Sequence, residues 1–238
     1  MTALLFREDA YRTESPGTVV AATAEGIRLD ASLFYPEGGG QPGDTGELAW
    51  EGAVCPITTC VKGENGDPVL VPAPGAPLPP VGTEVVQRID GDRRLRLMRM
   101  HTALHLLSVA IPLAVTGGSI GEGRSRLDFA MPEPPEDKAA IEAEVNRLIE
   151  ADLPVTEEWV DEAELDANPG LVKTLRVQPP RGSGRIRLIR IGEGEGTVDL
   201  QPCGGTHVRR TSEIGRIALG KVEKKGRENR RVYLTLAD

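Results

Sequence analysis

The stretch Leu95-Arg-Leu-Met-Arg-Met-His-Thr-Ala-Leu-His-Leu-Leu-Ser-Val-Ala110 decides how the second part of this chain folds. It is strongly apolar and longer than an ordinary strand, and Pro112 follows soon after it. We therefore expect a buried helix here. On such a helix His101 and His105 are four residues apart, so their side chains project from one face.

The third histidine and a nearby cysteine indicate a metal-binding site. The chain has 3 histidines and 3 cysteines, and His207 closes the segment Cys203-Gly-Gly-Thr-His207. Two spaced pairs that use every histidine predict one shared Zn²⁺ site with the ligands His101, His105, Cys203 and His207. The alternative is a pair of core histidines and an unrelated buried cysteine. That alternative does not explain the turn-forming residues around Cys203.

The spacing of the pairs favours an enzyme site over a zinc finger. Zinc fingers use closely spaced ligands, whereas these two pairs lie far apart in the sequence. The peptidase motif H-E-x-x-H is excluded, because Thr102 occupies the position of its general base.

The first part of the chain is expected to be β structure. Short apolar stretches alternate with glycine, proline and acidic residues over residues 1–92, and Glu84–Asp90 is predicted as the last strand. The proline-rich segment Pro68–Pro80 is predicted as an extended surface loop. Gly91 and Asp92 offer a turn and a helix cap, so we place a domain boundary after residue 92.

Residues 93–238 are expected to form an α+β domain. A glycine-rich turn is predicted at 117–121, a strand at 126–129, a helix that opens at 134–137, a strand at 184–191 with a bulge at Leu188-Ile189, and a hairpin around 224–229. No sequence pattern for a dinucleotide cofactor was found.

Charge is unevenly distributed. The net charge is −8, yet basic residues crowd 88–99, 181–190 and 209–231, while acidic residues crowd 133–166. The basic segments are either solvated strand faces or a positive surface for nucleic acid. No apolar run reaches the ~20 residues of a membrane helix, no signal peptide is evident, and the odd cysteine count suits a reducing compartment. We expect a cytoplasmic protein with no membrane partner.

Two motifs of the sequence resemble those of a known family. His101-Thr-Ala-Leu-His-Leu-Leu107 and Cys203-Gly-Gly-Thr-His207 resemble the two signatures of the alanyl-tRNA synthetase editing domain and of its free-standing relatives, the AlaX proteins. The stretch Phe34–Gly46 resembles the family's glycine-rich motif, which is typical of the medium-length type. The segments 118–129 and 223–231 are similar to the family as well, so the resemblance covers nearly the whole chain.

The resemblance implies a fold and a reaction. It implies an N-terminal β-barrel similar to one in translation factors, followed by a zinc-dependent editing domain. It implies hydrolysis of tRNA(Ala) mischarged with serine or glycine, with the basic segments on tRNA phosphates. The substrate-binding candidates are Thr102, Gly38, Gly39, Gly40, Gln41 and Ser119.

One position departs from the family pattern. Many synthetase editing domains have Gln-x-Gly-Ser where this chain has Thr116-Gly-Gly-Ser119. Thr102 is therefore the better candidate for recognising a serine hydroxyl, although a helix threonine can also bond to its own backbone. Two other functions stay open: a non-catalytic tRNA-binding module with a structural zinc, and a zinc hydrolase of small esters.

Overall fold

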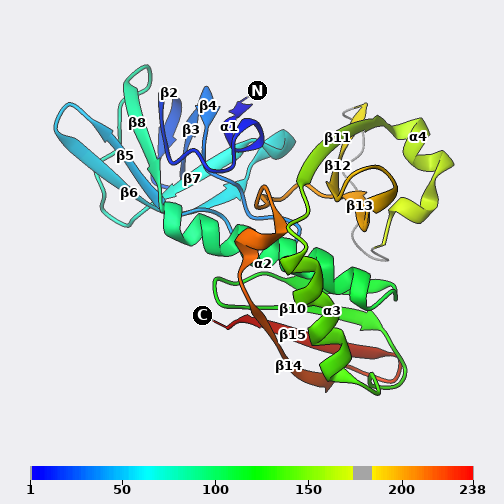
Figure 1. Ribbon diagram of the computed structural model, residues 1–238. Coiled ribbons are helices and arrows are strands. Elements are labelled where there is room, and N and C mark those ends of the chain that lie inside the picture. Colours follow the sequence, from blue (N-terminus) through cyan, green and yellow to red (C-terminus); the bar gives the residue numbers. More distant parts are fainter. Residues whose placement is uncertain (1, 174–183, 238) are drawn as a thin grey trace. The chain divides into compact units, whose positions relative to one another are not determined.

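The computed structural model describes residues 2–173 and 184–237 (Figure 1). The chain divides into two compact units, residues 1–95 and 96–238, and helix α2 (Gly91–Ala110) passes from the first into the second. Within the described ranges, no helix combines the length and the hydropathy that a membrane crossing requires.

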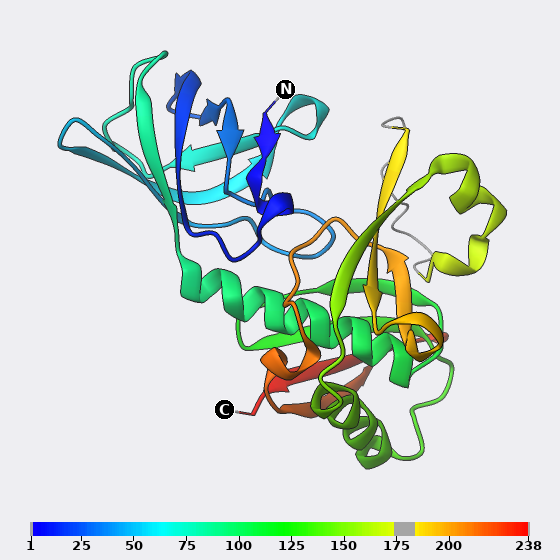
Figure 2. The same cartoon turned by 45° about the horizontal axis from the view of Figure 1, so that its top comes forward.

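The first unit is built around a closed barrel of six strands, in the order β2-β3-β7-β6-β5-β8 (Figures 1 and 2). This confirms the predicted barrel. Its strands are β2 (Glu14–Thr23), β3 (Gly26–Leu29), β5 (Gly46–Trp50), β6 (Ala53–Lys62), β7 (Pro68–Pro72) and β8 (Glu84–Ile89). Beside the barrel lie α1 (Leu5–Glu8), the short parallel pair β1 (Ala3–Leu4) and β4 (Ala31–Ser32), and the 3-10 turn η1 (Glu64–Gly66).

Alternating side chains fill the barrel. Ile27 and Leu29 of β3 are fully buried while Arg28 between them is exposed, which is the period of a strand with one face on a core. The core also takes in both free cysteines of β6. It consists of Val19, Ile27, Leu29, Leu33, Phe34, Leu48, Cys55, Ile57, Cys60, Leu70, Val85 and Ile89.

The predicted surface loop at Pro68–Pro80 is wrong in its first part. Residues Pro68–Pro72 form β7, which pairs with β6 from Lys62↔Pro68 to Ile57↔Pro72 and meets β3 at Ile27↔Leu70. The two prolines stand at the strand's ends, where a missing N–H costs little, and the apolar Val-Leu-Val between them supplies buried Leu70.

A buried ion pair fixes the first turn of α2 to the barrel unit. Arg94 donates from Nε to Asp44 Oδ1 at 3.0 Å and forms an ion pair with Oδ2, and both side chains are 2% exposed. The guanidinium also donates to the carbonyls of Ala10 at 2.9 Å and Leu33 at 2.8 Å. The backbone N–H of Tyr35 donates to Asp44 at 2.6 Å. Arg94, predicted as part of a basic segment on tRNA, is therefore a structural residue.

The second unit holds two antiparallel sheets. One has the order β14-β15-β10-β9, and the other has the order β11-β12-β13. The strands are β9 (Val115–Ser119), β10 (Arg124–Ala130), β11 (Val155–Asp161), β12 (Arg185–Ile191), β13 (Asp199–Pro202), β14 (Ile217–Lys224) and β15 (Asn229–Leu236). The helices are α3 (Lys138–Glu150) and α4 (Glu162–Ala167), with 3-10 turns η2 (Pro169–Leu171), η3 (Gly194–Gly196) and η4 (Thr211–Ile214).

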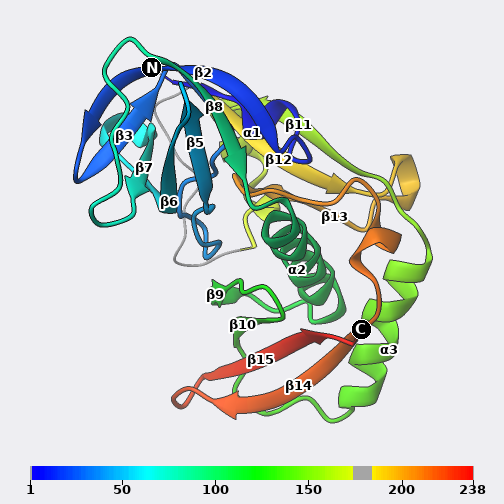
Figure 3. The ribbon, with the colours of Figure 1, turned by 90° about the vertical axis from the view of Figure 1, so that its left-hand side faces the viewer.

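The long helix covers one face of the four-stranded sheet. Figure 3 shows α2 along the sheet β14-β15-β10-β9, with α3 beside it. Phe129, Val232 and Leu234 are fully buried on the covered face. Helix α3 is capped by Asp137, which accepts from Ala140 N at 2.9 Å, and Asn146 on α3 exchanges two 3.0 Å hydrogen bonds with the backbone of Ile217 on β14.

Two local predictions in this unit are wrong, the first only in part. Of the turn predicted at 117–121, residues 117–119 belong to the edge strand β9, because β10 pairs with them on its free side, with a register shift at Asp128/Phe129, while residues 120 and 121 lie in the connection between the two strands. The expected bulge at Leu188-Ile189 is absent, since β12 pairs with β11 in continuous register from 185 to 191. Both residues are buried because that strand is covered on both faces. The hairpin around 224–229 is confirmed.

We expect Asp44→Ala to lower the free energy of unfolding by about 3–5 kcal/mol, because it leaves the Arg94 guanidinium charged and without its buried partner. Urea unfolding is the measurement. The matched control is Glu14→Ala, which removes an exposed partner of Arg88 (side chains 58% and 45% exposed) and is expected to cost about 1 kcal/mol or less. Equal losses in the two variants would contradict the role given to the buried pair.

Candidate metal centre

Four potential metal ligands converge from two distant segments. Helix α2 provides His101 and His105, and the loop that follows β13 provides Cys203 and His207. Cys203 Sγ lies 3.4 Å from His101 Nε2 and 3.3 Å from His207 Nε2. One ligand atom from each residue lies within 4.8 Å of all the others. Three imidazole nitrogens and one sulfur at these separations match the donor set and spacing of a tetrahedral divalent cation site.

The environment favours the metal-binding forms of Cys203 and His207. Burial alone would raise the pKa of the Cys203 thiol, but the neighbouring charge of His101, with hydrogen bonds from His101 and His105, holds it well below its usual range. Burial and the charge of His101 lower the pKa of His207 to about 3. Metal ligands must be deprotonated, so a thiolate beside a neutral imidazole suits this chemistry.

Thr102 orients the ring of His207. Its hydroxyl donates to the Met98 carbonyl at 3.0 Å and lies 3.1 Å from His207 Nδ1, and it accepts from Val208 N at 3.3 Å. A hydroxyl has one proton, so with that proton on Met98 its oxygen accepts from Nδ1–H of His207. The lone pair of the ring is then at Nε2, toward Cys203. Thr102 is fully buried, and these three bonds use its hydrogen-bonding capacity.

Asp199 plays the corresponding part for His105. Its Oδ2 lies 2.8 Å from His105 Nδ1, and Lys173 forms an ion pair with its other oxygen. Burial alone would raise the pKa of Asp199, but the hydrogen bond and charge of His105, with the charge of Lys173, lower it to about 2. Burial likewise would lower the pKa of His105, and the bonds to Asp199 and Cys203 instead raise it to about 9. A bound cation would have to displace that proton from His105.

An arginine holds the loop that carries Cys203. Arg187 Nη1 donates to the carbonyls of Cys203 at 3.1 Å and Gly205 at 2.9 Å, and the Arg187 carbonyl accepts from Cys203 N at 3.2 Å. Arg187 Nε also pairs with Glu157 at 2.5 Å, and its side chain is only 12% exposed. Arg187 therefore shapes the site rather than meeting a phosphate, which corrects its assignment to a basic tRNA-binding segment. Arg181 of that segment lies outside the described residues.

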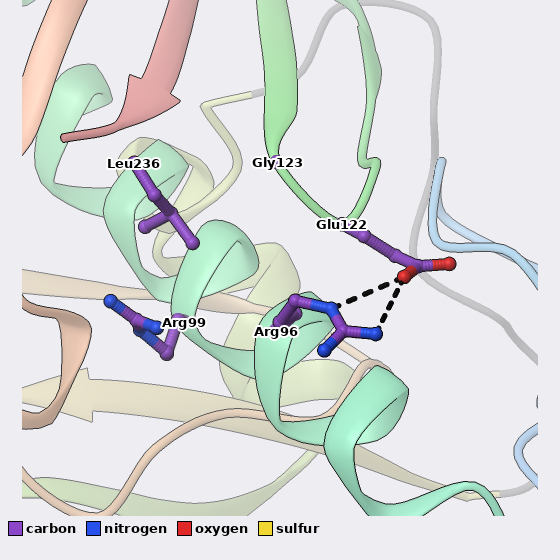
Figure 4. Close-up of a pocket in the computed structure, with 5 residues that line it drawn as sticks. All are labelled: Arg96, Arg99, Glu122, Gly123 and Leu236. Atoms are coloured by element: carbon purple, nitrogen blue, oxygen red, sulfur yellow. Dashed lines mark hydrogen bonds and ion pairs between the residues drawn. The ribbon is translucent and has the colours of Figure 1, made fainter. Parts of the chain in front are cut away.

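Two other predicted phosphate contacts are also engaged within the protein. Arg96 and Arg99 line a pocket with Glu122, Gly123 and Leu236 (Figure 4). Arg96 donates to Glu122 at 2.9 and 3.2 Å, the two hydrogen bonds drawn as dashed lines, and Arg99 Nε donates to the Ile214 carbonyl at 2.7 Å.

The basic tail is only partly exposed. Arg230 is buried and donates to the Pro132 carbonyl. Exposed bases persist in the β14–β15 hairpin, at Lys224, Lys225 and Arg227.

The glycine-rich motif lies in the first unit and forms a tight turn. Gly38 and Gln41 exchange two backbone hydrogen bonds of 3.0 Å, with Gly39 (φ 60) and Gly40 (φ 82) at the tip. The side chain of Gln41 is buried, and a side chain at Gly39 would meet nothing within 4 Å. By contrast, a Cβ at Gly43 would lie 2.0 Å from the Cys60 carbonyl, so that glycine is required for packing on β6. The motif thus combines an open tip with a packed base.

The structure brings together the four predicted ligands and Thr102. Ser119 lies exposed on the edge strand β9, in register with Arg126 on β10. Sequence reasoning missed Asp199, Lys173 and the true role of Arg187. The one available signal for Asp199 was an acid between the apolar residues Val198 and Leu200, which is a weak indicator of a buried charge.

The sequence is similar to that of known proteins that act on alanyl-tRNA. The family described as "Threonyl and Alanyl tRNA synthetase second additional domain" matches residues 186–233. The chain is 37% identical to an alanyl-tRNA editing protein AlaX-M of Methanosarcina barkeri over the full length of both, and 36% identical to one of Saccharolobus solfataricus over 99% of each. It is also 39% identical to an alanine–tRNA ligase of Caldivirga maquilingensis over 94% of this chain, but spans only 25% of that longer protein.

We expect the wild-type protein to bind one zinc ion per chain. We expect His207→Ala to lose most of its zinc content, because only three of the four tetrahedral ligands remain. Metal analysis of the purified proteins is the measurement. All three histidines of the chain belong to the cluster, so a histidine outside it cannot be used as the control. The control is instead Glu195→Ala, at an exposed position, and we expect it to bind as much zinc as wild type. Unchanged zinc in His207→Ala would refute the shared site.

Proposed function

Because the chain belongs to the AlaX-M family of alanyl-tRNA editing proteins, we propose that it hydrolyses the ester bond of tRNA(Ala) wrongly charged with serine or glycine. The observation that carries the proposal is the convergence of His101, His105, Cys203 and His207 in a chain that matches AlaX-M proteins from end to end. The basic hairpin at 224–227 is our candidate for contact with tRNA phosphates.

The donor chemistry of the cluster supports zinc as the cofactor. Three imidazoles and one thiolate form a set that zinc favours over calcium or magnesium, which prefer oxygen ligands. A zinc ion bound there would supply a Lewis acid for the ester carbonyl or for water. The protein's own contribution is to hold the ligands, with Thr102 and Asp199 orienting two of the rings. The three histidines are buried and Cys203 is partly exposed.

We keep two sets of substrate contacts as proposals. The open tip at Gly39 and Gly40, which follows Gly38 and has Gln41 as its buried anchor, offers backbone N–H groups to the acceptor end of tRNA. Thr102 and Ser119 are proposed as contacts for the attached amino acid. For Thr102 this would require one of its present hydrogen bonds to be exchanged for a bond to the serine hydroxyl.

One observation favours a second function. Four protein ligands already complete a tetrahedral zinc site, and closed sites of this kind are usually structural. On this alternative the chain binds tRNA without cleaving it. An editing enzyme would need zinc to accept a further ligand, or one protein donor to move away.

We expect the wild-type protein to deacylate Ser-tRNA(Ala) and Gly-tRNA(Ala) much faster than Ala-tRNA(Ala), and a chelator to abolish the activity. The assay follows release of the labelled amino acid with each tRNA, with and without added zinc after chelation. Binding of Ser-tRNA(Ala) with no hydrolysis above the uncatalysed rate would instead establish the non-catalytic alternative.

Thr102→Val tests both roles of this hydroxyl. The isosteric change removes the bond to His207 Nδ1, and loss of such an orienting group typically weakens metal binding by about 10–100-fold, which competition with a chelator measures. A direct role in reading serine adds a second expectation: at equal zinc content the Ser/Ala rate ratio should fall, because a site that bonds a substrate hydroxyl rejects the analogue that lacks it. An unchanged Ser/Ala rate ratio would mean that Thr102 does not contact the substrate and acts only through its hydrogen bond to His207.

A further inference from the structure

Asp199 is a buried carboxylate whose contacts converge from three parts of the second unit. Its side chain is 0% exposed. Oδ2 lies 2.8 Å from His105 Nδ1 on α2 and accepts from Gln201 Nε2 at 2.9 Å, and Oδ1 pairs with Lys173, which follows η2. Both oxygens are therefore occupied, one by a metal-ligand histidine and one by a cation.

Asp199 Oδ2 sets the tautomer of the His105 ring. Gln201 Nε2 lies 3.1 Å from His105 Nδ1, but an amide nitrogen and a ring N–H are both donors and cannot satisfy each other. Asp199 is the acceptor for both groups. Accepting from Nδ1–H leaves the lone pair of His105 at Nε2, the nitrogen available to the cluster.

Lys173 is the group that holds the carboxylate in place. Its backbone carbonyl accepts from Val115 N at 3.0 Å, at the start of β9, so the residue is tied to the sheet that α2 covers. Its side chain is 29% exposed, whereas the carboxylate with which it pairs is fully buried. A buried carboxylate without such a partner is strongly disfavoured.

We propose that Asp199 is a positioning residue of the metal centre, which aims His105 Nε2 at the bound ion, and that Lys173 holds the Asp199 carboxylate in place. The inference rests on the zinc site of the proposed function. It adds a charged pair, Lys173 and Asp199, that supports the four ligands without binding the metal. Asp199 also adds a negative charge behind His105, which makes the ring a better donor to a cation.

The test is zinc affinity of Asp199→Asn in the full chain, measured by competition with a chromophoric chelator. The asparagine keeps the shape and an acceptor oxygen but removes the charge, and we expect the zinc dissociation constant to rise about 10–100-fold. We also expect a changed absorption spectrum of the Co²⁺-loaded variant, which a purely structural role would not produce. Asp161→Asn is the matched control, since Asp161 lies in the same sheet with its side chain 76% exposed. It should bind zinc like wild type.

Lys173→Met is the second variant, and it keeps the test decisive if Asp199→Asn fails to fold. It retains the length of the side chain and removes the charge, so we expect a smaller but measurable loss of zinc affinity. Wild-type affinity and Co²⁺ spectrum in folded Asp199→Asn, or wild-type affinity in Lys173→Met, would overturn the corresponding half of the proposal. A wild-type protein that binds no zinc would instead overturn the proposed function itself.

Discussion

Three imidazoles and a thiol place their ligand atoms within 4.8 Å of one another, with the three histidines buried, and much of the second unit supports that arrangement. Such a cluster is unfavourable unless its groups share a cation or mutually adjusted protons. The low pKa values of Cys203 and His207 reflect this crowding. Helix α2 is buried along its ligand face, and the loop that carries Cys203 is held by Arg187. The ligands therefore meet because both of their supports are fixed.

The sequence was informative where a local hydrophobic pattern was clear or where every residue of one type could be accounted for. The apolar run ending at Ala110 predicted α2, and the use of every histidine in two pairs predicted the cluster. It was uninformative where tertiary pairing overrides composition. Pro68–Pro72 and Val115–Ser119 contain prolines or glycines that favour turns, yet neighbouring strands β6 and β10 recruit them into sheets. No local signal specifies which strand will offer a free edge.

The groups behind the ligands were beyond prediction for the same reason. Asp199, Lys173 and Arg187 act on His105 and Cys203 only because β12, β13 and the segment after η2 meet behind them. The clusters of arginine in the sequence suggested the wrong role, since Arg94, Arg187 and Arg230 belong to basic segments but donate hydrogen bonds within the protein. A linear sequence shows that a charge exists and leaves its partner undetermined.

The separation of the ligand pairs in the chain has a consequence for biosynthesis. His101 and Cys203 are 102 positions apart, so α2 leaves the ribosome long before the loop that completes the site. Until then two imidazoles on an apolar helix have neither their thiolate nor their third nitrogen. The four candidate ligands therefore come together late, after the sheets of the second unit have closed the intervening loop at an entropic cost. A chain that stalls before residue 203 would carry an exposed apolar helix with only two of the four residues, and exposed apolar surface of this kind favours aggregation.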